Sequence, residues 1–472
     1  METALKKNTF AGRSSKREGA FLLLFLLQAT ALRILHLGFQ PLWWDEGYSV
    51  WFATQNPAQM VSLTAQDIHP PLYYALLHGW AALLGTGPTA LRLFSVAVGV
   101  LTIPLLYLVA RRMLSARAAL LATLLLTISP LHVYYSQEVR MYGLVALLSV
   151  GILAAAWRAF DTETRRHGDT ARRRISLCLH VTPSPHHLVT YILLTTAALY
   201  TQYYAIFLPV GLTIYATWCW RRDLRVLLTW LGAQVIVALL YLPWVIYAAP
   251  KLAPYISQKI VADADRPLGA PVYLARHLAA FLIGHLEGPL ARGWPAALVL
   301  LVPIAIGMGL LFARSQAAGP QRTTDNPTGT LRGPQPAVRN PSRAILMLAT
   351  VVLTALILGW LISLRAPFFP ARGERLLILA LPPFILLAAA GLDALWTRWR
   401  GVGFIVLGLV VAISAASLAA FYTVPRYPDD DYRALIAHTV EQGLPRIRSS
   451  PFTRGRWAIG AATATRPDPP PF

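Results

Sequence analysis

The sequence predicts an all-α fold, a polytopic bundle of transmembrane helices. Of its 472 residues, 56% are hydrophobic and only 13% are charged, about half of the roughly 25% charged residues that soluble domains carry. Long apolar runs, each close to the roughly 17–25 residues that cross a bilayer, recur along the chain. These observations exclude an ordinary soluble domain and predict about 11 spans.

The first apolar run, at residues 19–38, follows a basic N-terminal segment, residues 1–18. No small-residue cleavage site follows the run, so we interpret it as a retained span rather than a signal peptide. The further predicted spans are 90–110, 118–133, 141–157, 188–203, 205–220, 226–248, 294–313, 344–363, 376–396 and 403–422.

Basic residues decide the predicted orientation. Arginine and lysine clusters flank every second loop, and the positive-inside rule places such clusters in the cytoplasm. The basic residues behind the net charge of +21 are therefore assigned to cytoplasmic loops that face anionic lipid. No nucleic-acid partner is expected. The N-terminus is predicted inside and the C-terminus outside. The outer segments are then 39–89, 134–140, 249–293, 364–375 and a tail, 423–472.

Three segments complete the predicted domain organisation around a transmembrane domain at 19–422. The long first outer loop, 39–89, is expected to form short interfacial helices. The inner loop 315–343 is rich in Pro, Gly and Arg and is expected to be disordered. The outer tail, 423–472, starts like a helix at 427–443 and then loses its apolar pattern, which suits a truncated soluble domain. Cys178 and Cys219 are not expected to form a disulfide framework.

The first outer loop carries acids beside aromatic residues. The stretch "PLWWDEGYSVWFATQ" holds Asp45 and Glu46, and "QDIHPPLYY" adds Asp67, His69 and Tyr73. The acids could instead be a solvated helix cap, and His69 could only shape a turn before two prolines. The aromatic residues suit an interfacial belt better than a sugar-stacking platform. A divalent ion bound by Asp45, Glu46 and His69 is a further alternative, but it is not favoured.

Two later outer segments carry further charged residues. One, "HVYYSQEVRMYG", holds Glu138, Arg140 and Tyr142, and the acid and arginine could also be a structural ion pair. The other, "LRAPFFPARGERLLILALPP", holds Arg372 and Arg375, which could also be anchors at a helix end. A carboxylate can take a proton from an attacking hydroxyl, and a guanidinium can hold a phosphate bidentately. The combination suits a lipid-linked phosphosugar.

Four stretches together resemble the bacterial family 39-type glycosyltransferases, GT-C fold relatives of the protein O-mannosyltransferases and of the lipid A aminoarabinose transferase. They are "PLWWDEGYSVWFA", the run from "DIHPPLYYALLHGW" to "LYLVARRML", "YYSQEVRMYGL" and "ERLLILALPPFILLAAAGL". The resemblance covers roughly residues 20–430. It implies a GT-C helical bundle that transfers a sugar from a polyprenyl phosphate to an acceptor at the extracytoplasmic face of the membrane. The anomeric configuration of the sugar would be inverted.

The resemblance also implies roles for individual residues. Asp45, with Glu46 beside it, matches the family's catalytic base. The family's His-Pro-Pro element maps onto His69, and its late phosphate-binding arginine maps onto Arg375, although Leu376 replaces the tyrosine that follows. The resemblance also maps Arg92, Glu138 and Arg140 onto family positions. Asp67, Tyr73, Tyr142 and Arg372, from the same outer segments, are further substrate-binding candidates.

Two other function classes stay open at this stage. A polytopic transporter or flippase of lipid-linked substrates would place ionisable groups at the bilayer midplane and show paired repeats. Here the acids lie in outer loops, and no internal repeat is visible. A non-catalytic remnant is the third interpretation. The sugar, the acceptor (a lipid, a protein or a glycan) and any metal requirement are not predicted.

Overall fold

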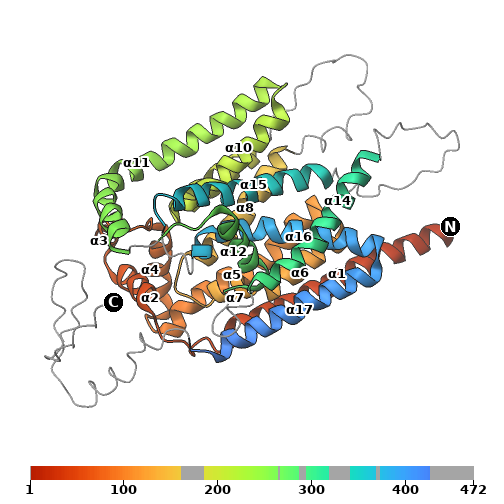
Figure 1. The fold of residues 1–472 in the computed structure, drawn as a ribbon, viewed down its shortest axis with the longest axis horizontal. Helices are drawn as coiled ribbons and strands as arrows, with labels where there is room; N and C mark the ends of the chain where they lie inside the picture. Colours follow the sequence, from red (N-terminus) through yellow and green to blue (C-terminus); the bar gives the residue numbers. More distant parts are fainter. Residues whose placement is uncertain are drawn as a thin grey trace.

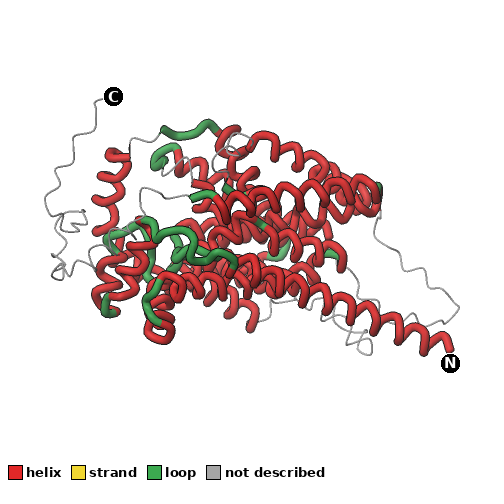
Figure 2. The backbone as a smooth tube through the Cα atoms, turned by 90° about the horizontal axis from the view of Figure 1, so that it is seen from below, coloured by secondary structure: helices red, strands yellow, loops and turns green. Residues whose placement is uncertain are grey.

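A computed structural model of the chain describes residues 2–160, 185–263, 266–285, 294–317, 341–367 and 373–425. Across these ranges the structure consists of helices and loops, without a strand. The longer helices run roughly along one common direction (Figures 1 and 2). The predicted all-α class is therefore confirmed.

The predicted spans all fall on helices. The corresponding elements are α1 (Glu2–Ile34), α5 (Pro88–Met113), α6 (Ala116–Ile128) with α7 (Pro130–Tyr135), α8 (Tyr142–Phe160), α9 (Pro185–Leu199), η2 (Tyr203–Ile206) with α10 (Phe207–Trp220), α11 (Leu224–Asp263), α13 (Trp294–Ala297) with η4 (Leu298–Leu300) and α14 (Leu301–Ala317), α15 (Pro341–Ser363), η5 (Gly373–Ala380) with α16 (Leu381–Arg398), and α17 (Arg400–Thr423).

Within the described ranges, seven helices are long and apolar enough to cross a membrane by length and composition. The count of about 11 spans therefore stays a prediction, because the other predicted spans lie on α1 or on shorter helices. The segment 118–133 is not the continuous helix that was predicted. Its helix ends at Ile128, and α7 begins at Pro130, where Ser129 caps it by accepting a hydrogen bond from the His132 amide at 3.4 Å. A proline that lacks an amide hydrogen fits this first-turn position.

The first outer loop contains the short helices that the sequence predicts. They are α2 (Trp44–Thr54), α3 (Pro57–Thr64) and α4 (Leu72–Leu84). Asn56 caps α3 by accepting from the Gln59 amide at 2.9 Å, a favoured N-cap interaction. The three helices form one end of the bundle (Figure 1).

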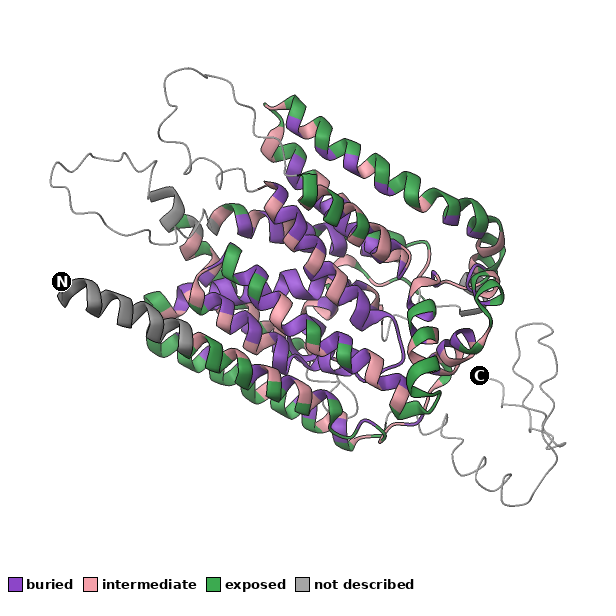
Figure 3. Cartoon of the chain, turned by 180° about the vertical axis from the view of Figure 1, so that it is seen from behind, coloured by how far each residue is buried: buried purple, intermediate pink, exposed green. Residues whose placement is uncertain are grey.

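The core lies between the central helices, and α11 and α14 lie at its periphery (Figure 3). The most apolar stretch of the η5–α16 segment is 83% buried, against 22% for α11 and 17% for Trp294–Leu311, which comprises α13, η4 and most of α14. Helices α14 and α16 cross closely, because a Cβ on Gly307 would overlap the backbone of Gly391. Small residues at such crossings are typical of packing inside membranes.

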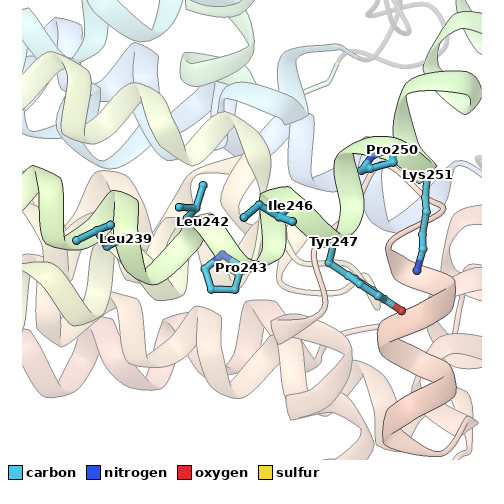
Figure 4. A pocket seen from close by; sticks show the side chains of 7 residues that line it. All are labelled: Leu239, Leu242, Pro243, Ile246, Tyr247, Pro250 and Lys251. Atoms are coloured by element: carbon cyan, nitrogen blue, oxygen red, sulfur yellow. The ribbon is translucent and has the colours of Figure 1, made fainter.

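Helix α11 carries an open, mostly apolar groove on its outer half (Figure 4). Three prolines, Pro243, Pro250 and Pro254, lie inside this helix. The Lys251 ammonium sits 3.4 Å from the centre of the Tyr247 ring. An apolar face with an aromatic ring and a lysine at one end is typical of a helix in lipid near the headgroups.

Basic residues gather at the opposite end of the bundle from α2–α4. Arg111, at the end of α5, pairs with Glu18 at 3.2 Å, and Arg117 pairs with Asp393 at 3.0 Å. Helix α5, of 26 residues, runs from the α2–α4 end to this basic end, about 39 Å at 1.5 Å per residue. The position of these basic residues at one end of the bundle agrees with the cytoplasmic side predicted for them. The central part of the predicted disordered loop, the segment 427–443, Cys178 and Arg372 lie outside the described residues.

The orientation is testable with single cysteines in a chain whose Cys178 and Cys219 are replaced by serine. Ala58→Cys, exposed on α3, should react with an impermeant maleimide added to intact cells. Leu224→Cys, exposed at the start of α11, should react only after the cells are opened. Labelling in the reverse pattern would show that the basic end faces outward.

Candidate active site

The candidate site forms where four separate segments meet at the α2–α4 end. These are the first turn of α2, the loop before α4, the loop between α7 and α8, and η5. They contribute Asp45, His69, Arg140 and Arg375, respectively. The four residues are up to 330 positions apart in the chain, yet ion pairs or hydrogen bonds link them all.

Asp45 lies between two guanidinium groups. Its Oδ2 is 3.4 Å from Arg375 Nη2 and 3.6 Å from Arg140 Nη2. Its side chain is 22% exposed, whereas both arginines are almost fully buried. Asp45 also lies in the first turn of α2, where the helix dipole favours a negative charge. The carboxylate therefore has two cations beside it and remains open to solvent or a ligand.

Arg140 is held in place by the loop before α4. Its Nη2 donates to His69 Nε2 at 3.0 Å, and its Nη1 donates to the Asp45 carbonyl at 3.0 Å. His69 Nδ1 lies 3.0 Å from Asp67 Oδ2. Since Arg140 can only donate, His69 accepts at Nε2 and donates from Nδ1 to Asp67. Asp67 thus fixes the imidazole that positions Arg140.

Burial and neighbouring charges shift the pKa values of His69 and Asp67. Burial and the neighbouring Arg140 lower the pKa of His69, against the opposing pull of Asp67 and Asp45. Burial raises the pKa of Asp67, but His69 and Arg140 outweigh it, so the net pKa is lowered. A neutral His69 and an ionised Asp67 near neutral pH are the states that the hydrogen bonds require.

Arg375 is placed by aromatic side chains. Its guanidinium carbon lies 5.4 Å from the centre of the Trp43 ring and 5.8 Å from that of Tyr142. Arg140 lies 5.8 Å from the same Tyr142 ring. Cation–π contacts hold a guanidinium without consuming its N–H donors. Arg375 can therefore keep donors for a ligand beside Asp45.

Glu46 has a different environment from its neighbour. It is fully buried, and its carboxylate accepts from Arg92 Nε at 3.1 Å, from Arg92 Nη2 at 2.7 Å and from the Val139 amide at 2.9 Å. Arg92 also donates to the carbonyls of Leu37, Gln40 and Pro41. This bidentate pair ties the start of α2 to α5 and to the loop that carries Arg140. The geometry suits a positioning group.

The remaining predicted site residues lie at different distances from Asp45 and its two arginines. Tyr73 is buried in an aromatic cluster with Tyr74 and Phe94. Glu138 is buried, lines a small cavity with Glu46 and Arg92, and accepts from Ser95 through its carbonyl. Tyr142 lies within the site, between the two arginines. Arg372 is outside the described residues.

Sequence reasoning missed a second polar cluster behind Arg375. Arg276, on α12 (Ala270–Ile283), donates from Nε to Glu374 Oε1 at 2.9 Å. His285 Nδ1 lies 3.7 Å from Glu374 Oε2, and its Nε2 lies 2.6 Å from the Tyr135 hydroxyl. The available signal was Arg276, an arginine in the apolar stretch "YLARHLAAFL" of the loop 249–293.

No group of three or more His, Cys, Asp or Glu side chains arranged to hold a metal occurs in the described part of the chain. Asp45, Glu46 and His69, the set considered for a divalent ion, do not converge. Glu46 points to Arg92, and His69 points to Asp67 and Arg140.

Known proteins resemble this chain in one sequence segment and in the arrangement of its helices. A model of the dolichyl-phosphate-mannose-protein mannosyltransferase family matches residues 68–167. That segment contains His69, Arg92 and Arg140 but neither Asp45 nor Arg375. No curated protein matches the chain by sequence.

Two solved structures share the arrangement of helices. The crystal structure of ArnT from Cupriavidus metallidurans in the apo state has a TM-score of 0.53 and 18% identity, and covers 89% of this chain and 68% of that one. The same protein bound to undecaprenyl phosphate has a TM-score of 0.53 and 18% identity, and covers 89% of this chain and 69% of that one. The predicted resemblance is thus confirmed at the level of the fold, which is ArnT-like and of GT-C type.

The buried Glu46–Arg92 pair predicts stability effects of different size for the two adjacent acids. Glu46→Gln leaves Arg92 without its counter-charge, and breaking a buried pair costs about 3–5 kcal/mol. Asp45→Asn removes a partly exposed carboxylate that faces Arg375 and Arg140 at 3.4 and 3.6 Å, longer than a hydrogen bond, so it should cost less stability than Glu46→Gln. Thermal unfolding of the detergent-purified variants measures both. Equal stability of the two variants would show that Glu46–Arg92 does not hold the loop.

Proposed function

We propose that the protein is an integral membrane glycosyltransferase that moves a sugar from a polyprenyl phosphate to an acceptor hydroxyl. The observation that carries the proposal is Asp45, a partly exposed carboxylate between two buried arginines. A carboxylate beside cations is the pairing that proton abstraction and phosphate departure need in one place. The family segment match and the fold support the same conclusion.

Asp45 is the proposed catalytic base. In this mechanism its carboxylate takes the proton of the acceptor hydroxyl as that oxygen forms a bond to the anomeric carbon. The bond from that carbon to the phosphate oxygen breaks, and the leaving polyprenyl phosphate keeps the electron pair. Attack from the face opposite the phosphate inverts the configuration.

Arg375 and Arg140 are the proposed phosphate-stabilising groups. Both already face Asp45 at 3.4 and 3.6 Å, which is longer than a charge-assisted hydrogen bond of about 2.7–2.9 Å. Neither guanidinium therefore has to break a short bond to the Asp45 carboxylate in order to face a phosphate. Negative charge develops on the phosphate as it leaves, so fixed cations there stabilise the transition state.

Supporting residues complete the proposed assignment. Asp67 and His69 orient Arg140, while Trp43 and Tyr142 hold Arg375. Glu46 and Arg92 are assigned to positioning, and Glu138 and Tyr73 to the wall of the site. The sugar, and the choice among lipid, protein and glycan acceptors, are left open by this proposal.

The proposal also assigns location and organisation. The active site faces the extracytoplasmic side of the cell membrane, because basic residues mark the opposite end as cytoplasmic. The chain comprises a basic N-terminus, residues 1–18, a transmembrane glycosyltransferase domain, residues 19–422, and an outer tail, residues 423–472.

Asp45→Asn tests the assignment of the base. The amide keeps the shape of the side chain but cannot take a proton, so transfer from a polyprenyl-phosphate sugar should fall by about 10²-fold or more. Binding of polyprenyl phosphate should be retained, because the arginines remain. Transfer and binding are measured on purified protein at matched concentration, with and without a chelator.

Thr54→Ala serves as the control, since Thr54 is exposed at the other end of α2. Its transfer rate should match that of the unmodified protein. Near-normal turnover by Asp45→Asn would overturn the assignment of Asp45. Inhibition of the unmodified protein by the chelator would instead indicate a metal.

A further inference from the structure

A basic cluster lies at the end of the bundle opposite the candidate active site, where α5, α8 and α9 come together. Arg112 lies in the last turn of α5, Arg158 in the last turn of α8, and His187 in the first turn of α9. These side chains are exposed or half-buried. Helix α8 packs against both α5 and α9, so the three basic groups meet at one place.

The packing of α8 on α9 sets Arg158 beside His187. A Cβ on Gly151 of α8 would overlap the side chain of Leu194 on α9, so these two positions face each other. Helix α8 runs toward the basic end, and α9 runs away from it. Arg158 lies seven residues after Gly151, and His187 lies seven residues before Leu194. Seven residues are close to two full turns, so the arginine and the histidine lie on facing sides at the same level.

Arg112 completes the cluster from the other side of α8. Helices α5 and α8 run in the same direction, and a Cβ on Gly143 would contact the Val98 side chain at 4.0 Å. Arg112 is 14 residues beyond Val98, and Arg158 is 15 residues beyond Gly143, so the two guanidinium groups lie at similar levels. Their like charges repel each other. Burial, followed by neighbouring cations that include both arginines, lowers the pKa of His187.

The cluster has no counter-charge within the described part of the chain. No carboxylate of the described residues pairs with any of its three members. The adjacent Arg111 differs, because it faces α1 and pairs with Glu18 at 3.2 Å. The segment 161–184, which connects α8 to α9, carries five arginines against three acids, so it adds positive charge. The favoured counter-charge is therefore an anion from outside the chain.

An apolar face leads from the cluster along the bundle. On α5, Leu101 and Leu108 are 57% and 50% exposed and lie on the same side as Arg112. On α9, Val189 and Leu193 are 54% and 60% exposed. The intervening helix α8 presents a half-buried strip with the spacing of one helix face, which consists of Leu147, Gly151, Ala154 and Arg158. An apolar chain can lie along this face while a polar group attached to it reaches the cluster.

The combination of cations and apolar face distinguishes between classes of anion. A guanidinium holds a phosphate bidentately, and a neutral or charged imidazole can donate to it as well. A soluble anion would gain nothing from the exposed leucines. An anionic phospholipid uses both features, since basic residues at the membrane surface attract its headgroup and the bilayer already surrounds the apolar face.

We propose that the ends of α5, α8 and α9 form a binding site for an anionic phospholipid, whose phosphate pairs with Arg112 and Arg158 and whose acyl chain lies along the apolar face. The site is separate from the candidate active site. Helix α8 starts at Tyr142 in that site and ends at the cluster, about 28 Å away for 19 residues at 1.5 Å each. The inference goes beyond the proposed catalytic function and does not depend on it.

A double variant, Arg112→Gln with Arg158→Gln, tests the site. Native mass spectrometry of the full-length protein in detergent would measure binding of phosphatidylglycerol, with phosphatidylcholine and inorganic phosphate as comparison ligands. The double variant should bind phosphatidylglycerol about 25-fold more weakly, at about 5-fold for each arginine. Phosphatidylcholine should bind more weakly than phosphatidylglycerol, and inorganic phosphate should not displace the lipid. Arg375→Ala, which alters the proposed active site, should leave phosphatidylglycerol binding unchanged.

Thermal unfolding of the same proteins shows that the variants fold. In lipid-free detergent the double variant should unfold at the same temperature as the unmodified protein or higher, because two like charges are removed. Phosphatidylglycerol should raise the unfolding temperature of the unmodified protein but not that of the double variant. The matched control is Arg400→Gln, which removes an exposed arginine at the same end of the bundle, on α17. It should behave as the unmodified protein does.

Several results would overturn the site. Unchanged phosphatidylglycerol affinity in the double variant is the result expected if the chain's own segment 161–184 covers the cluster. Equal binding of phosphatidylcholine would remove the requirement for an anionic lipid, and full competition by inorganic phosphate would remove the requirement for a lipid. An equal loss in Arg400→Gln would show a general effect of charge, and an equal loss in Arg375→Ala would place the phospholipid in the active site.

Discussion

The need to compensate buried charge is the constraint on which the site depends. Four guanidinium groups in the apolar bundle, those of Arg33, Arg92, Arg140 and Arg375, are almost fully buried, and an uncompensated buried charge is strongly unfavourable. Each therefore takes partners from other segments of the chain. Arg92 ties α5 to Glu46 on α2 and to the loop before α2, while Arg140 and Arg375 take Asp45. The same pairings that satisfy the arginines bring the segments of the site together.

The two adjacent acids show how environment separates two roles. Glu46 is fully buried and paired with Arg92, whereas Asp45, one residue earlier on the helix, keeps part of its side chain exposed. A helix turns by 100° per residue, so neighbours in sequence face different surroundings. Glu46, held by Arg92, thus fixes the position of Asp45.

Sequence reasoning could predict the helical class, the helical segments and the candidate residues that the structure brings together around Asp45. Their chemistry is visible in short polar stretches such as "WWDEGYS" and "QEVR" between apolar runs. It could not predict which acid is buried, because Asp45 and Glu46 have equivalent surroundings in the sequence. The break at Ser129–Pro130 was missed because the apolar pattern continues across it. The Arg276–Glu374 pair joins residues 98 positions apart, and Arg33 finds the carbonyls of Leu126 and Thr127 through the same break. Tertiary pairings of this kind leave no local pattern.

The central claim is that Asp45 and its arginines form a site for a lipid-linked phosphate. The most direct measurement is the affinity of the purified protein for polyprenyl phosphate, compared among Arg375→Ala, Arg375→Lys and Arg365→Ala, with thermal unfolding to verify folding. Arg365 is exposed and serves as the control. The account predicts a loss of at least about tenfold for Arg375→Ala, a smaller loss for Arg375→Lys because a point charge lacks the guanidinium fork, and no loss for Arg365→Ala. A folded Arg375→Ala protein that binds polyprenyl phosphate as tightly as the unmodified chain would contradict it.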